Sequence, residues 1–226
     1  MTESLTLDIR NLSVVYNANT SDEVIALKNF SLQVKQGEII VITGGNGTGK
    51  STLLKAISGA IPISSGQIFA NGKEITDWNF IKRTELMSSV HQDTMLGTSP
   101  NLTLHENFQL INSKKWWLPS PYKLALTDEQ IFNIQKIGLN LEKRALSKLN
   151  MFSGGQRQAI ALCLAHENAK KILLLDEFTS SLDDTTSKNV MTYTFAEAKK
   201  EGTTILMVMH DTKPIEDFQF KQIFLK

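Results

Sequence analysis

The sequence predicts an α/β fold in which a mainly parallel sheet is covered by helices on both faces. Short, apolar, β-branched runs at Glu38–Thr43, Ile172–Asp176 and Thr204–Met209 are typical of strands buried in a parallel sheet. Helical patterns at Ser51–Ser58 and Thr185–Lys200 alternate with these runs. Strands that alternate with helices predict a layered α/β core.

The N-terminal part of the chain predicts an antiparallel β subdomain. Leu5–Tyr16 alternates imperfectly between apolar and polar residues, and Val24–Val34 follows after a polar loop. Asn71-Gly72 is typical of a two-residue hairpin turn. We expect two further strands, at Met87–His91 and Gln222–Leu225.

A helical insertion interrupts the core. From about residue 101 to about residue 149 helical patterns dominate, at Leu104–Leu110 and Asp128–Ile137, and Pro119 and Pro121 break them. We therefore expect one domain over residues 1–226. Its core would take about residues 1–92 and 168–226, and a helical subdomain about residues 93–167.

Composition is that of a soluble globular protein. With 226 residues, 41% of them hydrophobic, the chain is long enough for a substantial core. A net charge of +1 gives no support for a nucleic-acid partner. The single Cys163 excludes an intrachain disulfide, and its apolar surroundings predict a buried core residue. We expect no signal peptide and no membrane span, because the most apolar runs are far shorter than the roughly 20 residues that span a bilayer.

The run Gly44-Gly45-Asn46-Gly47-Thr48-Gly49-Lys50-Ser51 follows a predicted strand and opens a predicted helix. This is the context of a P-loop, in which glycines bring backbone N–H groups close to phosphate oxygens. We expect Lys50 to reach the β and γ phosphates and Ser51 to bind Mg²⁺. The loop residues and the adjacent Thr52 form the predicted ATP-binding segment. The predicted α/β fold is therefore that of a P-loop nucleoside triphosphatase.

Two acids end the buried strand Ile172–Asp176. Asp176 lies at the carboxyl edge of the predicted sheet, where ligands bind, and can complete a Mg²⁺ shell. Glu177 can polarise a water for attack on the γ phosphate. The alternative is a pair of helix N-terminal acids before Thr179.

A second phosphate-binding element is predicted at Phe152-Ser153-Gly154-Gly155-Gln156. Ser153 can cap a helix whose first residues lack side chains, so an external group can approach the amides. Taken alone, this segment fits an ordinary helix N-cap better than a phosphate site.

These motifs together resemble the nucleotide-binding domain of ABC-type ATPases over nearly the whole chain. The resemblance implies that the segment Phe152–Gln156 binds the γ phosphate held by the P-loop of another subunit. It also implies that Tyr16 stacks on adenine, that Gln92 contacts Mg²⁺ and relays to a membrane subunit, and that His210 contacts the γ phosphate. Asp183 belongs to the matching loop after the acidic pair.

Each of these matches has a plainer alternative, and the chain departs from the family pattern at two places. Tyr16 can be an ordinary strand residue, Gln92 a polar loop residue and His210 a residue with a structural role. Phe152 stands where leucine is usual, and we expect it to pack against the helical insertion. Phe178 stands where proline is usual, a change that can reshape its loop.

The resemblance implies a Mg²⁺-dependent ATPase subunit of an ABC transporter. It would act as a homodimer or with a paired ATPase, at the cytoplasmic face of the inner membrane, through separate permease subunits. The loop Val90–Thr103 is similar to that of ATPases that accompany branched-chain-type permeases and a solute-binding protein, which favours import, with amino acids as candidate solutes. The alternatives are a non-transport ABC ATPase that acts on a macromolecule and, more distantly, a P-loop kinase. Lys114-Lys115-Trp116-Trp117 fits either a membrane or permease contact or packing around the two prolines.

Overall fold

The computed structural model describes residues 5–93, 96–112, 126–167 and 170–225. One layer is an antiparallel sheet in the order β2-β1-β4-β5. It is built from β1 (Leu5–Tyr16), β2 (Val24–Lys35), β4 (Ser65–Ala70) and β5 (Lys73–Glu74). The turn between β4 and β5 has φ values of 49° at Asn71 and 74° at Gly72, which suit a hairpin. The predicted N-terminal antiparallel pair and hairpin are confirmed.

The second sheet is parallel and has the order β6-β7-β8-β3-β9. Its strands are β3 (Ile39–Gly44), β6 (Met87–Val90), β7 (Ile172–Asp176), β8 (Thr204–Val208) and β9 (Lys221–Leu225). All five predicted strands are therefore present. Because β3, β7 and β8 lie side by side and point the same way, the loops after them meet at one edge of the sheet.

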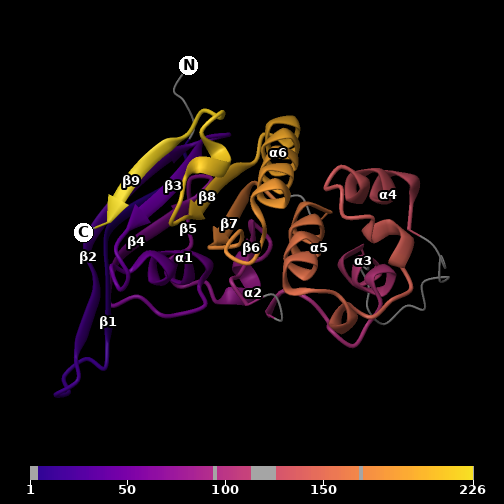
Figure 1. Cartoon of the computed structure of the whole chain (residues 1–226). Coiled ribbons are helices and arrows are strands. Elements are labelled where there is room, and N and C mark those ends of the chain that lie inside the picture. Colours follow the sequence, from indigo (N-terminus) through magenta and orange to yellow (C-terminus); the bar gives the residue numbers. More distant parts are fainter. Residues whose placement is uncertain (1–4, 94–95, 113–125, 168–169, 226) are drawn as a thin grey trace.

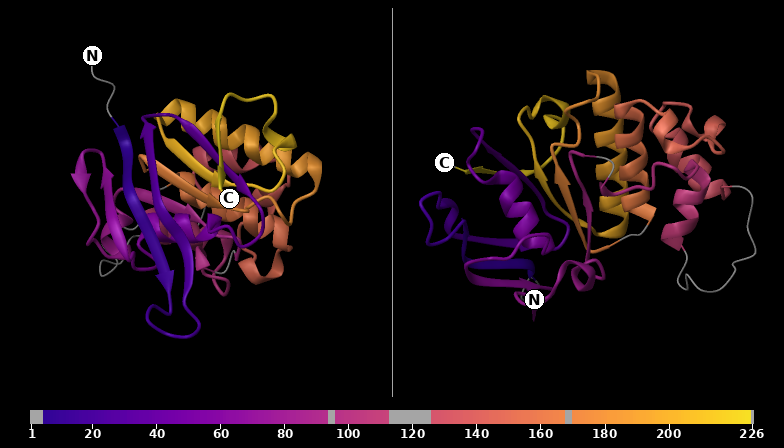
Figure 2. Two further views of the ribbon diagram at one scale, coloured as in Figure 1. Left: turned by 90° about the vertical axis from the view of Figure 1, so that its left-hand side faces the viewer. Right: turned by 90° about the horizontal axis from the view of Figure 1, so that it is seen from below.

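Helices cover both faces of this sheet. Helix α1 (Lys50–Ser58) packs on one face, where its Leu53 joins a core with Ile172 and Leu174. On the other face, α5 (Gly154–Glu167) and α6 (Asp184–Glu201) pack in a second core with Leu173 and Leu175. The alternation along β7 thus places α1 and α5 on opposite sides of the sheet (Figure 2).

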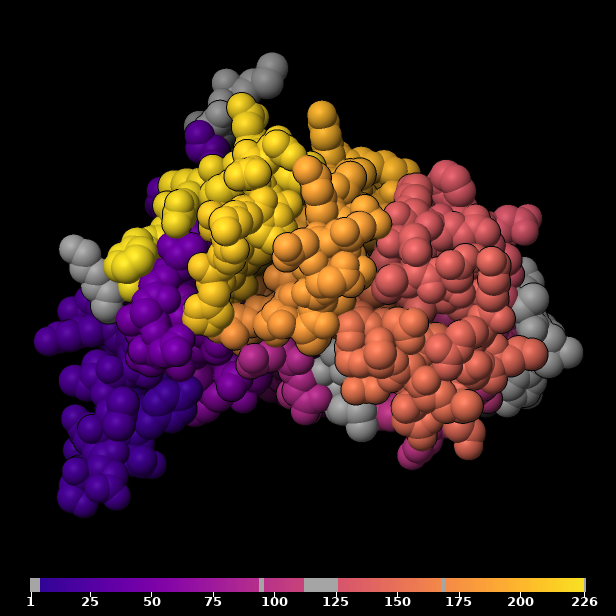
Figure 3. Space-filling view, viewed as in Figure 1, coloured from indigo at the N-terminus to yellow at the C-terminus, as the bar shows by residue number. Residues whose placement is uncertain are grey.

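A helical region precedes and includes α5. It contains α3 (Leu104–Asn112), α4 (Asp128–Gln135) and the short 3₁₀ turns η2 (Leu141–Arg144) and η3 (Leu149–Met151). In Figure 1 and Figure 3, α4 lies at the end of the molecule opposite to the β1–β2 hairpin, and α5 lies between α4 and the parallel sheet. Both predicted helices are confirmed, whereas Lys114–Trp117, Pro119 and Pro121 lie outside the described residues.

Two short elements complete the fold, α2 (Phe80–Arg83) and η4 (Lys213–Ile215). The sequence did not predict α2, whose buried Arg83 donates to the carbonyl oxygens of Ala56 and Ile57 at 2.8 and 2.7 Å and so ties α2 to the end of α1. Cys163 is buried, as expected. Among the described residues, no helix combines the length and apolarity that a bilayer span requires.

Candidate functional site

The glycine loop joins β3 to α1 in a conformation that requires glycine. Gly49 has a φ of +87°, and a Cβ at that position would lie 2.3 Å from the carbonyl oxygen of Ala26 in β2. Gly47 has a φ of +80° in open space. The loop therefore leads directly into the N-terminus of α1, where unpaired N–H groups and the helix dipole favour an anion.

Lys50 extends back along this loop. Its ammonium donates to the carbonyl oxygens of Gly44 and Gly45 at 3.0 and 2.7 Å. The residue is only 5% exposed. The Thr48 hydroxyl also donates to the Gly45 carbonyl, at 2.9 Å. These bonds hold one positive charge beside the backbone amides, an arrangement suited to a polyphosphate.

Ser51 and Asp176 meet across the edge of the sheet. The Ser51 hydroxyl donates to Asp176 Oδ1 at 2.9 Å, which links the start of α1 to the end of β7. Burial raises the pKa of the Asp176 carboxyl, and the charge of Glu177 acts in the same direction, while the bond from Ser51 opposes them. A hydroxyl and a carboxylate are hard oxygen donors, the type that Mg²⁺ prefers, so this pair fits that ion.

Glu177 and His210 form a second pair beside the first. His210 Nε2 lies 2.8 Å from Glu177 Oε1 and joins the residues after β7 and β8. Glu177 has a φ of +48°, a left-handed conformation that costs a non-glycine residue about 1–2 kcal/mol. Its N–H donates to the carbonyl oxygen of Val208 at 3.2 Å. This backbone bond fixes Glu177 to the end of β8.

Tyr16 lies at the end of β1, close to α1. Its hydroxyl is 3.3 Å from the Thr52 hydroxyl, and the side chain is 38% exposed. The ring is therefore available at the rim of the glycine loop.

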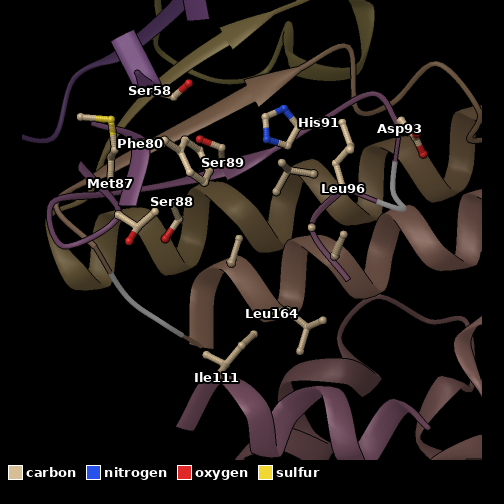
Figure 4. Close-up of a pocket in the computed structure, with 15 residues that line it drawn as sticks. Ser58, Phe80, Met87, Ser88, Ser89, His91, Asp93, Leu96, Ile111 and Leu164 are labelled. Atoms are coloured by element: carbon tan, nitrogen blue, oxygen red, sulfur yellow. The ribbon is translucent and has the colours of Figure 1, made fainter. Parts of the chain in front are cut away.

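Gln92 is exposed, and within the described residues no hydrogen bond joins it to Ser51 or Asp176. Its neighbour His91 instead reaches toward Asp176. His91 and Asp176 line a small cavity, and His91 also lines a larger neighbouring cavity of about 220 Å³. The larger cavity lies between β6 and α5, with Phe80, Asp93 and Leu96 around it (Figure 4). Burial lowers the pKa of His91, and the charge of Asp176 opposes this.

The segment Phe152–Gln156 forms the start of α5 and closes a capping box. The Ser153 hydroxyl accepts from the Gln156 N–H at 3.3 Å, and Gln156 Oε1 accepts from the Ser153 N–H at 3.1 Å. A Cβ on Gly154 would meet nothing within 4 Å, so this amide end is open. Gly155, by contrast, packs against the Ser181–Leu182 loop.

Phe152 is 3% exposed and joins the core of the helical region, as expected. Phe178 is fully buried and fills the core behind Glu177. Asp183 caps α6, because its carboxylate accepts from the Thr186 N–H at 2.9 Å and from the Thr186 hydroxyl at 2.7 Å. The backbone bond from Thr186 lowers the pKa of Asp183. Its carboxylate thus has a structural role within this chain.

The structure brings together the loop, Lys50, the Ser51–Asp176 pair and the Glu177–His210 pair at one sheet edge. The segment Phe152–Gln156 belongs instead to α5, on the other face from α1.

The comparisons with known proteins agree with this arrangement. The family model for ABC transporters matches residues 27–180. The chain belongs to the ABC transporter family. It is an ATP-binding, ATP-hydrolysing cassette, which confirms the activity that the P-loop and the acidic pair predict.

Two relatives illustrate the range of this ABC cassette. It is 38% identical over 208 residues to the tyrosine transport ATP-binding protein of Clostridioides difficile (strain R20291), which covers 92% of this chain and 83% of that one. It is 34% identical over 194 residues to the ABC transporter ATP-binding protein YtrE of Bacillus subtilis (strain 168), with coverages of 84% and 80%.

Solved cassettes have the same fold. One, a dimer in a post-hydrolysis state bound to ADP and phosphate, is 27% identical, has a TM-score of 0.80 and covers 97% of this chain and 94% of its own. Another, cbiO1 from Clostridium perfringens, part of the ABC transporter complex cbiONQ, is 26% identical with a TM-score of 0.78 and coverages of 99% and 86%. The predicted ABC ATPase fold is confirmed.

Sequence reasoning missed some residues that touch the site. His91 lines both cavities, and Arg144 contacts the Phe152–Gln156 segment. The family pattern assigned them no role, and Arg144 lies several residues before the segment that it contacts. No short-range sequence pattern links either residue to the site.

Proposed function

We propose that this cassette powers solute import through a separate membrane permease, and that two copies hydrolyse Mg²⁺-ATP at shared sites. The observation that carries the proposal is the contact between Glu177 and His210, 2.8 Å long, beside the Ser51–Asp176 pair. An acid, a histidine and a hydroxyl–carboxylate pair then face the helix start where the phosphates would lie.

Each residue at this edge has a role in the proposal. Lys50 and the loop residues Gly44–Gly49 bind the phosphates, with Thr52 beside them, and Tyr16 stacks on adenine. Ser51, Asp176 and Gln92 hold Mg²⁺, which neutralises charge on the phosphates when bound. Glu177 orients a water and takes its proton, and His210 steadies the γ phosphate and the Glu177 carboxylate.

The second half of each site comes from a partner copy. Within one chain α1 and α5 pack on opposite faces of the sheet, so the open amide end at Gly154 and Gly155, with the Ser153 hydroxyl beside it, is left for a nucleotide held by another subunit. Gln156 orients that end through the capping box, and Asp183 supports the neighbouring loop. A two-fold, head-to-tail dimer satisfies both ends of both copies.

The cavity beside His91 is the proposed contact with the permease. It lies between the parallel sheet and the helical region, next to Gln92, and exposed apolar Leu96 lies at its edge. A helix of the permease seated there would sense a change at Asp176 through His91 and Gln92. We therefore propose that the cassette acts at the cytoplasmic face of the inner membrane.

An amino acid is the proposed solute, delivered by a solute-binding protein. The support is the relative described as a tyrosine transport ATP-binding protein, together with the similarity of the loop Val90–Thr103 to cassettes of branched-chain-type systems. Deleting the gene should reduce uptake of labelled tyrosine or a related amino acid, and the intact gene should restore it. Unchanged uptake of amino acids would contradict this part of the proposal.

Mixing two defective subunits tests the shared site. Lys50→Ala removes the phosphate-binding ammonium and Ser153→Arg blocks the start of α5, so each homodimer should be inactive. The mixture should recover about a quarter of the wild-type ATPase activity, because half of random dimers are mixed and each carries one intact site of two. No recovery from two folded subunits that form mixed dimers would contradict the shared site.

A further inference from the structure

Arg144, the last residue of η2, contacts the residues around the start of α5 in three ways. Its Nη2 donates to the carbonyl oxygen of Met151 at 2.9 Å, and its Nη1 lies 3.5 Å from Gln156 Oε1. Its guanidinium carbon lies 4.2 Å from the centroid of the Phe152 ring. A planar guanidinium can stack on a ring and donate in two directions at once, which an ammonium cannot do.

These contacts converge on the amides that open α5. Gln156 Oε1, which Arg144 approaches, also accepts from the Ser153 N–H at 3.1 Å. On the other side, Arg157 Nη1 donates to the Phe152 carbonyl oxygen at 2.6 Å. Two arginines therefore bind consecutive carbonyl groups immediately before Ser153.

The Phe152 ring gives Arg144 a fixed surface. It is 3% exposed within the core of the helical region, so its position does not depend on solvent or on a partner. Phe152 also stands where the family usually has leucine, which offers no aromatic face. The stack is therefore a feature that this chain's own sequence makes possible.

We propose that Arg144 is a positioning residue for the phosphate site that α5 offers to the partner copy. It holds Phe152 and Gln156 so that the amides of Gly154 and Gly155 point at the partner's γ phosphate. This inference rests on the shared site proposed above. Its consequence is directional: Arg144 acts on hydrolysis at the partner's glycine loop and not at its own.

The test uses mixed dimers with one working P-loop and places Arg144→Met either on the subunit with that P-loop or on its partner. A subunit with an intact P-loop is kept at trace concentration, and Lys50→Ala subunits are added in excess, so nearly every working loop meets a Lys50→Ala partner. Arg144→Met on the excess subunit alters the α5 that serves the working loop. On the trace subunit, the same substitution alters only the α5 that faces the dead loop.

We expect about a tenfold lower kcat in the first arrangement, because amides that are displaced from the γ phosphate stabilise the transition state less. In the second arrangement kcat should stay within about twofold of the control. The KM for ATP should change little in both, because the P-loop is intact. Equal losses in the two arrangements, or a loss only in the second, would overturn the proposal.

Two further variants keep the result interpretable if Arg144→Met folds poorly. Arg144→Lys keeps the charge but not the planar stack, and it should restore only part of the lost kcat. Full activity of Arg144→Lys would overturn positioning by the stack. Lys143→Met, in the same turn and exposed, is the matched control and should behave as wild type in both arrangements.

The same experiment separates this inference from the shared site itself. If Lys50→Ala subunits with an unaltered α5 fail to support hydrolysis by the trace subunit, the shared site is wrong. If they support it and Arg144→Met shows no directional effect, the shared site stands and only the role of Arg144 is wrong.

Discussion

The two ends of this chain that are predicted to bind phosphate are built differently. The glycine-loop end is assembled from the edges of β3, β7 and β8, and its side chains already contact one another in a single chain. The α5 end consists of open amides, fixed from behind by a capping box and two arginines. The first end carries the side chains that we propose hydrolyse ATP, and the second offers backbone amides alone. In the proposed mechanism, neither end is a catalytic site without the other.

The largest expected effect concerns the chemistry of the first end. Glu177→Gln keeps the shape of the side chain but removes the base, so turnover should fall about 100- to 10,000-fold. ATP binding should persist, and the cassette should accumulate as an ATP-dependent dimer that size-exclusion chromatography detects. Asp211→Asn changes an exposed acid next to His210 and serves as the control. Near-normal turnover of Glu177→Gln would remove Glu177 as the base.

The second prediction concerns the shape of the first end. Gly49→Ala adds a Cβ that would lie 2.3 Å from the Ala26 carbonyl oxygen at a φ of +87°, so nucleotide affinity should fall on the order of 100-fold. Gly47→Ala has nearly the same φ, +80°, but meets nothing within 4 Å. It should cost about tenfold or less, from backbone strain alone. Calorimetric titration with ATP compares the two, and equal losses would show that contact with β2 does not shape the loop.

A third prediction concerns His166, which is buried in the helix α5 that begins at the second end. Burial lowers the pKa of His166 in α5 to about 4, and the charge of Glu197 opposes this only in part. Its Nε2 is buried and forms no hydrogen bond with the residues that the structure describes, and its ring packs edge-on against Tyr193 at 5.4 Å. Since the unfolded chain binds a proton near the ordinary pKa of 6.5 and the folded chain does not, stability falls as the pH drops from 6.5 toward 4.

This loss should amount to roughly 2 kcal/mol between pH 6.5 and pH 5. His166→Phe keeps an aromatic ring against Tyr193 and removes the titration. Urea unfolding at the two pH values should therefore show a smaller loss in the variant than in the wild type. The same pH dependence in both would show that His166 is solvated in the folded protein.

The sequence predicted the first end better than the second. Residues such as Lys50, Ser51 and Asp176 sit next to strand ends, and the parallel order of the sheet brings strand ends together. The strand periodicity and the sequence motifs were therefore enough to predict which residues meet at this end. No sequence motif predicts the left-handed conformation of Glu177, because neither Glu177 nor an adjacent residue is glycine. The conformation accompanies the burial of Phe178 and the backbone bond to Val208, which are tertiary contacts.

The second end depends on contacts between segments that no short-range pattern links. The capping box was readable from Ser153 and Gln156, three residues apart. The contacts of Arg144 depend on how η2 and η3 fold over the buried Phe152 ring. The order of the strands and the ion pair between Lys136 and Glu197, 2.9 Å long, also depend on tertiary packing. The same long-range packing fixes α5 on the opposite face from α1.

The smallest expected effects come from two neighbouring glycines of the second end. A Cβ on Gly154 meets nothing within 4 Å, whereas one on Gly155 would lie 2.9 Å from Leu182 Cδ2 and 3.1 Å from the Ser181 carbonyl oxygen. In an isolated chain, Gly154→Ala should therefore be neutral or stabilise by about 0.5–1 kcal/mol, because alanine favours a helix. Gly155→Ala should lower stability slightly, since the Ser181–Leu182 loop must move.

Activity should not follow stability at these positions. If a partner's γ phosphate approaches the amides of α5, the methyl group of Gly154→Ala intrudes on it, and turnover should fall about tenfold in a protein that unfolds no more easily than the wild type. Thermal unfolding and steady-state ATPase assays on the two variants measure both quantities. A Gly154→Ala cassette with full activity would mean that nothing binds at the open end of α5, and the two ends would then not share a site.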